Sequence, residues 1–140
     1  MVDELIGQLI DGRYHVKGLL GAGGVGRVFR AHEADLDRDV AVKLLHKSIS
    51  NDPKMNARFV QEARAASRIQ HPNAVSVFAF GAWQGQLFIA MELLGGKSLA
   101  ELMDAGEKFP DERIVRLLSQ TCDVLAIAHA EGMVHRDLKP

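Results

Sequence analysis

The sequence predicts an α+β fold, in which strands with one principal helix beside them precede a second, helical part. Two observations support this prediction. Between Tyr14 and Leu45, glycine clusters separate short segments in which apolar and polar residues alternate, a pattern typical of strands and turns. Two other segments, 53–69 and 111–130, repeat their apolar residues at the spacing of a helix.

Five strand candidates fall into two groups. Three lie around the glycine clusters, and two form a later hairpin whose turn is expected near Trp83-Gln84-Gly85-Gln86. The five segments are 16–20, 25–31, 40–45, 75–80 and 87–93.

The third strand candidate carries a lysine among apolar residues. Strand alternation places Lys43 on the face opposite Val42. A lysine in such a strand needs a charged partner or a route to solvent. A solvent-facing lysine on an edge strand is the simpler alternative, and this segment alone does not decide between them. His46 and Lys47, at the end of the strand, are expected to face solvent.

The first long helix candidate contains a glutamate close to its apolar face. Three apolar residues at i, i+4 and i+7 predict one buried face: Phe59, Ala63 and Ala66. Glu62 lies on or beside this face, so its carboxylate needs a partner, and Lys43 would provide one. Local pairing of Glu62 with Arg58 or Arg64 is the alternative.

The second long helix candidate, 111–130, begins with acidic residues and ends at Gly132, which are favourable start and stop signals. Its apolar residues cover most of the helix circumference, which is typical of a helix inside a larger body. Only ten residues follow Ala130, too few to cover it, so we expect the chain to stop inside a domain. A short helix is expected near 98–104.

Length and composition exclude several classes of protein. The 140 residues suggest one domain, and a net charge of −1 argues against a nucleic-acid-binding protein. The single cysteine, Cys122, makes neither an internal disulfide nor a cysteine-based zinc site and is expected in the core. A signal peptide and an apolar run long enough to cross a membrane are both missing, so we expect a cytoplasmic protein. His129 lies near the end of its helix, where it suits the helix dipole.

Three glycines between the first two strands are candidates for a phosphate-binding loop. Gly21, Gly23 and Gly26 allow backbone N–H groups to approach an anion without a Cβ in the way. A flexible hairpin loop explains these residues equally well. A dinucleotide-binding fingerprint fits the same spacing but requires a helix next, whereas 27–31 favours a strand.

Several motifs in this order resemble those of eukaryotic-type protein kinases. The ending Lys139-Pro140 is similar to that of Ser/Thr kinases, and the leader at 10–14 and the glycine loop are similar to those of bacterial members. The motifs that carry the resemblance are Gly21-x-Gly23-x-x-Gly26-x-Val28, Val40-Ala41-Val42-Lys43, Glu62, His71-Pro72-Asn73 and His135-Arg136-Asp137-Leu138-Lys139-Pro140.

The resemblance implies a role for each matched residue. Lys43 would contact the α- and β-phosphates of ATP and be held by Glu62, and Asp137 would act as base or orienter for the substrate hydroxyl. Lys139 would steady the γ-phosphate, and Arg136 would take part in control by the activation loop. The backbone of Gly21, Ala22, Gly23, Gly24, Val25 and Gly26 would cover the phosphates. The adenine would contact Leu20, Val28, Ala41, the gatekeeper position Met91 and the hinge residues from Glu92 to Leu94.

The resemblance also implies an architecture. After a leader at 1–11, residues 12–94 would form the ATP-binding N-lobe and hinge, with a five-stranded, mainly antiparallel sheet and helix C over 56–69. Residues 95–140 would form an incomplete helical C-lobe. The asparagine and the Asp-Phe-Gly that hold Mg²⁺ in this family would lie beyond Pro140, so we expect the 140-residue chain alone to be inactive.

The resemblance further implies which partners the complete protein would have. These are ATP, Mg²⁺ and a protein substrate with a Ser or Thr hydroxyl, without nucleic acid, a metal site in this chain or a membrane segment in it. If 140 residues are the natural length, a non-catalytic ATP-binding or kinase-interacting module is the alternative. Such a module would associate through the exposed helix at 111–130.

Overall fold

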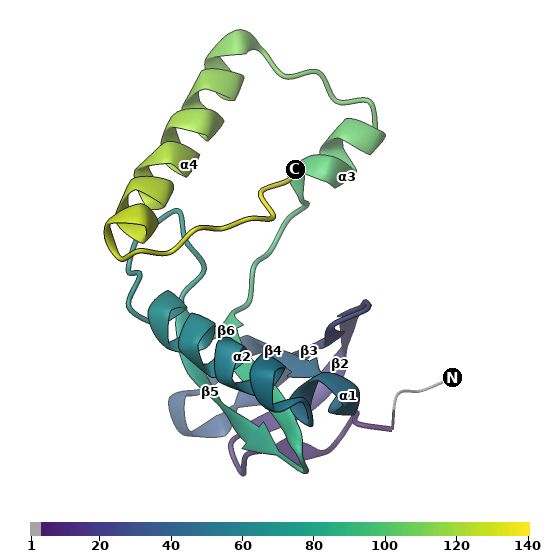
Figure 1. Ribbon diagram of the computed structural model, residues 1–140. Coiled ribbons are helices and arrows are strands. Elements are labelled where there is room, and N and C mark those ends of the chain that lie inside the picture. Colours follow the sequence, from purple (N-terminus) through teal and green to yellow (C-terminus); the bar gives the residue numbers. More distant parts are fainter. Residues whose placement is uncertain (1–3) are drawn as a thin grey trace. The chain divides into compact units, whose positions relative to one another are not determined.

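The computed structural model describes residues 4–140, which form two compact units. The sheet unit comprises the chain up to Arg68 together with Val75–Leu94. The helical unit comprises Ile69–Ala74 and Gly95–Pro140. The predicted α+β class is therefore confirmed, with strands and helices in the first unit and helices in the second (Figure 1).

The sheet has six antiparallel strands in the order β1-β2-β3-β4-β6-β5. All five predicted strands are present, and a two-residue strand that is too short to show alternation in the sequence adds a sixth. A turn of 3-10 helix, η1 (Ala34–Leu36), connects β3 to β4. The strands are β1 (Leu9–Ile10), β2 (Tyr14–Ala22), β3 (Gly26–Glu33), β4 (Arg38–Leu45), β5 (Val77–Trp83) and β6 (Gln86–Glu92).

The core of the sheet unit follows the predicted alternation of β4. Val42 is fully buried and pairs with Phe29 on β3 and with Ala90 on β6, both also fully buried. Tyr14 and Phe88 meet edge to face in the same core, with ring centroids 6.0 Å apart. On the other face of β4, Ala41 and Leu45 are also buried, and Lys43 between them is half-buried.

Two helices belong to the sheet unit. The short helix α1 (Lys47–Ser50) was not predicted, since four residues are too few to show a period. The principal helix α2 (Pro53–Ala66) begins at residue 53, as the apolar spacing predicts, and not at residue 56, because the Asp52 carboxylate accepts hydrogen bonds from two backbone N–H groups of the first turn. It ends before the expected residue 69. It lies across one face of the sheet and contacts β5 (Figure 1). Of the predicted buried face, Ala63 is buried, whereas Phe59 and Ala66 are half-buried.

The helical unit contains α3 (Leu99–Asp104) and α4 (Asp111–Ala130), at the predicted positions. Ser98 and Glu101 form a capping box that starts α3. Large apolar side chains of α4 are exposed, with Val115 at 66% and Leu118 at 60%. Cys122 is exposed as well, so the expectation that it packs in a core is wrong for this structure. Within residues 4–140, no helix combines the length and apolar character needed to span a bilayer.

A buried carboxylate closes the end of the sheet at the β3–β4 connection. Glu33 is fully buried, and its two oxygens accept hydrogen bonds of 2.6 Å from Arg13 Nη2 and Arg38 Nε. Burial alone would raise the pKa of Glu33, but the hydrogen bonds from Arg38 and Arg13 outweigh it and hold the pKa below the ordinary 4.5. Glu33 is therefore ionised in the folded protein at neutral pH.

Replacing Glu33 with glutamine is expected to destabilise the protein by about 2–3 kcal/mol at pH 7, because two arginines lose their anionic partner. The folded pKa of Glu33 is depressed, so its stabilisation is complete above the ordinary pKa and disappears as the pH falls through the folded pKa. Urea unfolding at several pH values should show the difference between Glu33→Gln and wild type shrinking as the pH falls below the ordinary glutamate pKa of 4.5. The control is Glu107→Gln, which removes an exposed pair with Arg113. A glutamine variant as stable as wild type at pH 7 would contradict this account.

Candidate active site

The glycine-rich loop connects β2 to β3 and is closed by a hydrogen bond of 2.9 Å from Gly23 N–H to Gly26 O. Its glycines are not equivalent. A Cβ on Gly26 would collide with the backbone of β4, including Leu45 Cα at 2.9 Å. A Cβ on Gly21, Gly23 or Gly24 would meet nothing within 4 Å, and none of the three has a positive φ. Among these four loop glycines, only Gly26 is required by the packing of the fold, and the other three leave the space above the backbone free for an approaching group.

Lys43 lies on the sheet face opposite the core. On this face it is flanked across the strands by Val28 of β3 and Ile89 of β6. Lys43 is half-buried, and among residues 4–140 its ammonium group has no hydrogen-bond or ion-pair partner. An unpartnered ammonium on a largely apolar strand face is ready to receive an anion.

The same face carries further residues expected at the adenine. Ala41 lies two positions before Lys43 and pairs with Met91 on β6, so the two share the face of Lys43. Val28 pairs with Gly21, which brings the start of the glycine-rich loop to this face too. Five predicted residues therefore share one surface, which includes the ammonium group of Lys43. They are Gly21, Val28, Ala41, Lys43 and Met91.

The predicted hinge follows β6. Glu92 is the last residue of β6, and its N–H and carboxylate bind the backbone of Ser76, so its side chain is already used. Leu94 lies beyond the strand and is exposed, and its backbone groups have no hydrogen-bond partner within the described part of the chain. Leu20 and Val25 are also exposed, at the two sides of the glycine-rich loop.

Glu62 is not beside Lys43 in this structure. Its carboxylate accepts a hydrogen bond of 2.8 Å from Arg58 Nε, one helical turn earlier, and the Glu62 side chain is 63% exposed. The expectation that Glu62 lies on the buried face of its helix is thus corrected. The local partner that the sequence left open as an alternative is the one observed, because residues i and i+4 are neighbours on a helix surface.

The motif at 135–140 lies in the helical unit, after α4. Lys139 Nζ and Asp137 Oδ2 are 3.0 Å apart, so the structure brings this acid and lysine together. Both side chains are exposed, and the Asp137 N–H donates to His135 Nδ1 at 3.3 Å. Arg136 has a φ of +62°, a conformation that is uncommon outside glycine and that concentrates at functional sites.

His46 is a contact residue of the glycine-rich loop that sequence reasoning placed in solvent. It is half-buried, and its ring Nε2 is 2.9 Å from Gly23 O. No local sequence signal could have found this contact, because 23 positions separate the two residues and the β3–β4 pairing brings them together.

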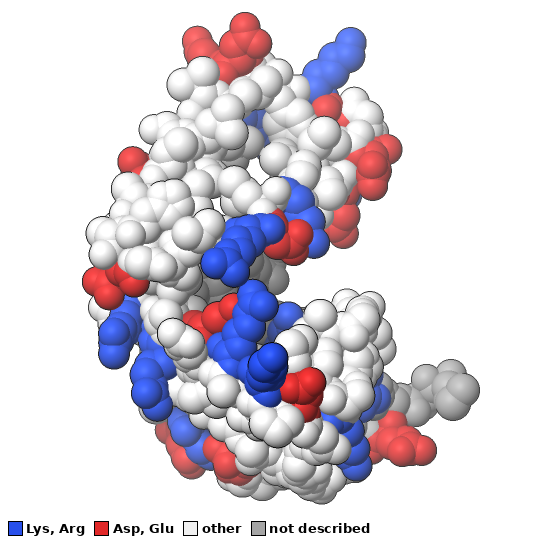
Figure 2. Space-filling model, viewed as in Figure 1, with Lys and Arg blue, Asp and Glu red and all other residues white. Residues whose placement is uncertain are grey.

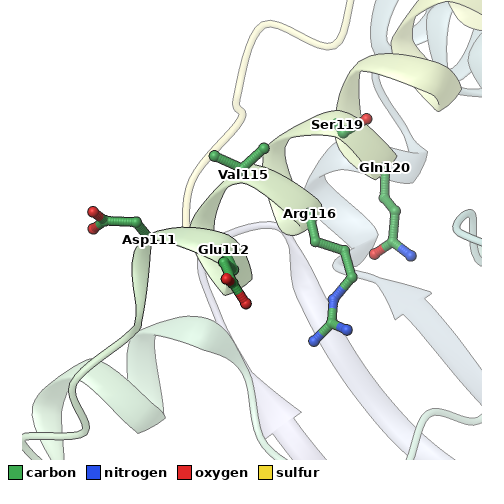
Figure 3. Close-up of a pocket in the computed structure, with 6 residues that line it drawn as sticks. All are labelled: Asp111, Glu112, Val115, Arg116, Ser119 and Gln120. Carbon is green, nitrogen blue, oxygen red and sulfur yellow. The ribbon is translucent and has the colours of Figure 1, made fainter.

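A pocket elsewhere in the molecule involves none of these residues (Figure 3). It is lined by one side of α4: Asp111, Glu112, Val115, Arg116, Ser119 and Gln120. On the face shown in Figure 2, Lys and Arg side chains are interspersed with Asp and Glu, in keeping with the near-neutral net charge. In residues 4–140, no group of three His, Cys, Asp or Glu side chains is placed to hold a metal ion.

Comparison with known proteins identifies the arrangement. The family description "Protein kinase domain" matches residues 14–140. The chain belongs to the protein kinase family. Its glycine-rich loop, its strand lysine at Lys43 and its HRDLKP motif at 135–140 are all inside the matched region.

Bacterial Ser/Thr kinases are among the similar proteins. The chain is 45% identical over 139 residues to serine/threonine-protein kinase pkn3 of Myxococcus xanthus, covering 99% of this chain and 25% of that protein. It is 37% identical over 136 residues to serine/threonine-protein kinase PrkC of Bacillus subtilis, covering 97% of this chain and 21% of that protein.

A solved structure is similar too. The crystal structure of the Mycobacterium tuberculosis PknI kinase domain superposes with a TM-score of 0.85 at 28% identity, covering 96% of this chain and 56% of that one. The chain therefore spans a quarter or less of the two curated relatives and about half of the solved kinase domain.

Proposed function

We propose that the protein containing this chain is a Ser/Thr protein kinase that transfers the γ-phosphate of ATP to Ser or Thr hydroxyls of protein substrates. The observation that carries the proposal is the Lys43 ammonium, which has no partner among the described residues and shares a sheet face with the open glycine-rich loop. Both features suit a bound polyphosphate.

In this proposal the sheet unit binds ATP. Val28, Ala41 and Met91 provide an apolar surface for the adenine, and the unpaired backbone of Leu94 is free to bind its polar edge. The phosphates would lie against the open backbone at Gly21, Gly23 and Gly24, where the unpaired Gly24 N–H would stabilise negative charge. Mg²⁺, when bound with ATP, supplies charge neutralisation on the phosphates.

In the proposed active state, Glu62 exchanges its partner Arg58 for Lys43. An exposed pair at i, i+4 contributes only about 0.3–0.5 kcal/mol, so the Arg58 contact is easily given up. A Glu62 carboxylate that reached Lys43 would hold the ammonium in place for the phosphates. The proposed active state therefore differs from the described one in the partner of Glu62.

Asp137 is the proposed base or orienter of the substrate hydroxyl. The hydroxyl oxygen forms a bond to the γ-phosphorus, the bond from that phosphorus to the β–γ bridging oxygen breaks, and ADP leaves. The hydroxyl proton passes to the Asp137 carboxylate. Lys139, whose ammonium is 3.0 Å from the Asp137 carboxylate, would neutralise the charge of a transferring phosphoryl group.

The proposed enzyme also has expected partners and an expected location. Its partners are ATP and a protein with an accessible Ser or Thr, without a nucleic acid. Its location is the cytoplasm, where ATP is available. The interspersed charges of both signs support a protein substrate over a polyanion, because binding to nucleic acid relies on a clustered basic surface (Figure 2).

Replacing Asp137 with asparagine is expected to lower the rate of phosphoryl transfer about a thousandfold, because the amide cannot accept the hydroxyl proton. The measurement follows transfer from γ-labelled ATP to a generic protein substrate and to the enzyme itself, using the protein encoded by the complete gene. Asp104→Asn on α3 is the matched control and should leave the rate unchanged.

Two outcomes would contradict this proposal. An Asp137→Asn variant as active as wild type would remove Asp137 from the mechanism. A wild-type protein that binds ATP without transferring phosphate would favour the non-catalytic ATP-binding module.

A further inference from the structure

The His46 side chain hydrogen-bonds the backbone of the glycine-rich loop. It follows the last residue of β4 and precedes α1, in extended conformation. Its ring Nε2 lies 2.9 Å from Gly23 O, and its backbone N–H donates to Val25 O at 3.1 Å. The tip of the loop is therefore attached to β4 through one residue.

The ring contact determines how one peptide of the loop is oriented. The C=O of Gly23 and the N–H of Gly24 belong to the same planar trans peptide and point in opposite directions. A Gly23 carbonyl held by His46 therefore directs the Gly24 N–H away from His46. Without that contact, two adjacent glycines leave this peptide free to rotate, because glycine occupies a wide range of φ and ψ.

The Gly24 N–H is free to serve a ligand. Within residues 4–140 it has no hydrogen-bond partner, and a Cβ on Gly24 would meet nothing within 4 Å. An unpaired N–H in open space at the tip of the loop is the kind of donor that a phosphate oxygen binds.

We propose that His46 is a positioning residue for ATP, acting through the Gly23 carbonyl to aim the Gly24 N–H at the phosphates. This inference rests on the proposed kinase function, and it adds a residue that the family motifs in this chain do not include. The ring must carry its proton on Nε2 to donate to Gly23 O. The contact organises the loop before ATP arrives, so its loss weakens binding of ATP and of the transition state equally.

The test measures steady-state kinetics and nucleotide binding with the protein encoded by the complete gene. His46→Ala is expected to raise KM for ATP and Kd for a fluorescent ATP analogue about fivefold, the effect of one ordinary hydrogen bond, with kcat changed less than twofold. His46→Gln should restore wild-type values, because its side-chain amide N–H reaches about as far as Nε2. His46→Asn is too short and should behave like alanine.

The matched control is His15→Ala. The His15 ring Nε2 lies 3.1 Å from the carbonyl oxygen of Gly7. The variant therefore removes a similar contact from the same sheet, at a distance from the glycine-rich loop. It is expected to leave KM for ATP unchanged. An increase in KM for both histidine variants would mean that the effect is general, and would overturn the proposal.

A spectroscopic readout keeps the test independent of stability. In wild type, ¹⁵N-resolved ring spectra should show His46 with its proton on Nε2, and the Gly24 amide should shift strongly on adding ATP. In the folded alanine, asparagine and glutamine variants of His46, the ATP-induced shift of the Gly24 amide should be largest where KM for ATP is lowest. Should no variant fold, a wild-type His46 ring without a proton on Nε2 would by itself overturn the proposal.

The kinetic outcomes separate this inference from the proposed function. If wild type binds and transfers phosphate while His46→Ala keeps the wild-type KM, the positioning role is wrong and the kinase function stands. If wild type binds no ATP, both are wrong.

Discussion

Replacing Lys43 with methionine is expected to reduce phosphoryl transfer by about 10²–10³-fold, the loss typical of one pre-organised charge stabiliser. Methionine matches the length of the lysine stem, and among the described residues the Lys43 ammonium has no hydrogen bond or ion pair that the variant would lose. Thermal unfolding should therefore remain within a few degrees of wild type, while activity on a protein substrate falls.

The control for Lys43 is a second lysine of the same sheet. Lys17 on β2 is exposed, and its ammonium contacts the ring of His15. Lys17→Met is expected to leave the rate of phosphoryl transfer unchanged. Equal losses in both variants, or full activity of Lys43→Met, would contradict the role assigned to Lys43.

Replacing Gly26 with alanine is expected to destabilise the protein by about 3 kcal/mol, the upper range for overpacking a well-packed site. The added Cβ would collide with backbone atoms of Leu44 and Leu45 on the neighbouring strand, and a paired strand moves only by breaking its hydrogen bonds. The measurement is the midpoint of urea unfolding for wild type and variant.

Gly24→Ala is the matched control for Gly26, because its Cβ would meet nothing within 4 Å. It should unfold at nearly the wild-type midpoint. A Gly24 variant as unstable as the Gly26 variant would show that the loop needs glycine for its conformation, not for the packing of β3 against β4.

The sheet and the long helix could be predicted because their patterns are local. Alternation in 40–45 determines which β4 residues enter the core, and acidic residues and Gly132 delimit the helix at Asp111–Ala130. The short elements β1 and α1 were not predicted, because segments of two and four residues are too short to show a periodic pattern of apolar residues.

The candidate site was predictable only where side chains share an element or a known motif. Lys43, Val28 and Met91 meet because strand register brings them together. Glu62 was expected near Lys43 but pairs with Arg58. This exposed local contact contributes less than about 0.5 kcal/mol, yet it determines the rotamer of the Glu62 side chain. The His46 contact with Gly23 depends on the pairing of β3 with β4, so no periodicity in the sequence predicts it.

We expect ATP to bind on the sheet face formed by the glycine-rich loop, Lys43 and Met91. The most direct test is a titration of ¹⁵N-labelled protein with a non-hydrolysable ATP analogue and Mg²⁺, followed by amide chemical shifts. We expect the shifts to be concentrated at Gly21–Gly26, around Lys43 and at Met91–Leu94. Shifts confined to the α4 pocket around Val115, or none at millimolar analogue, would contradict it.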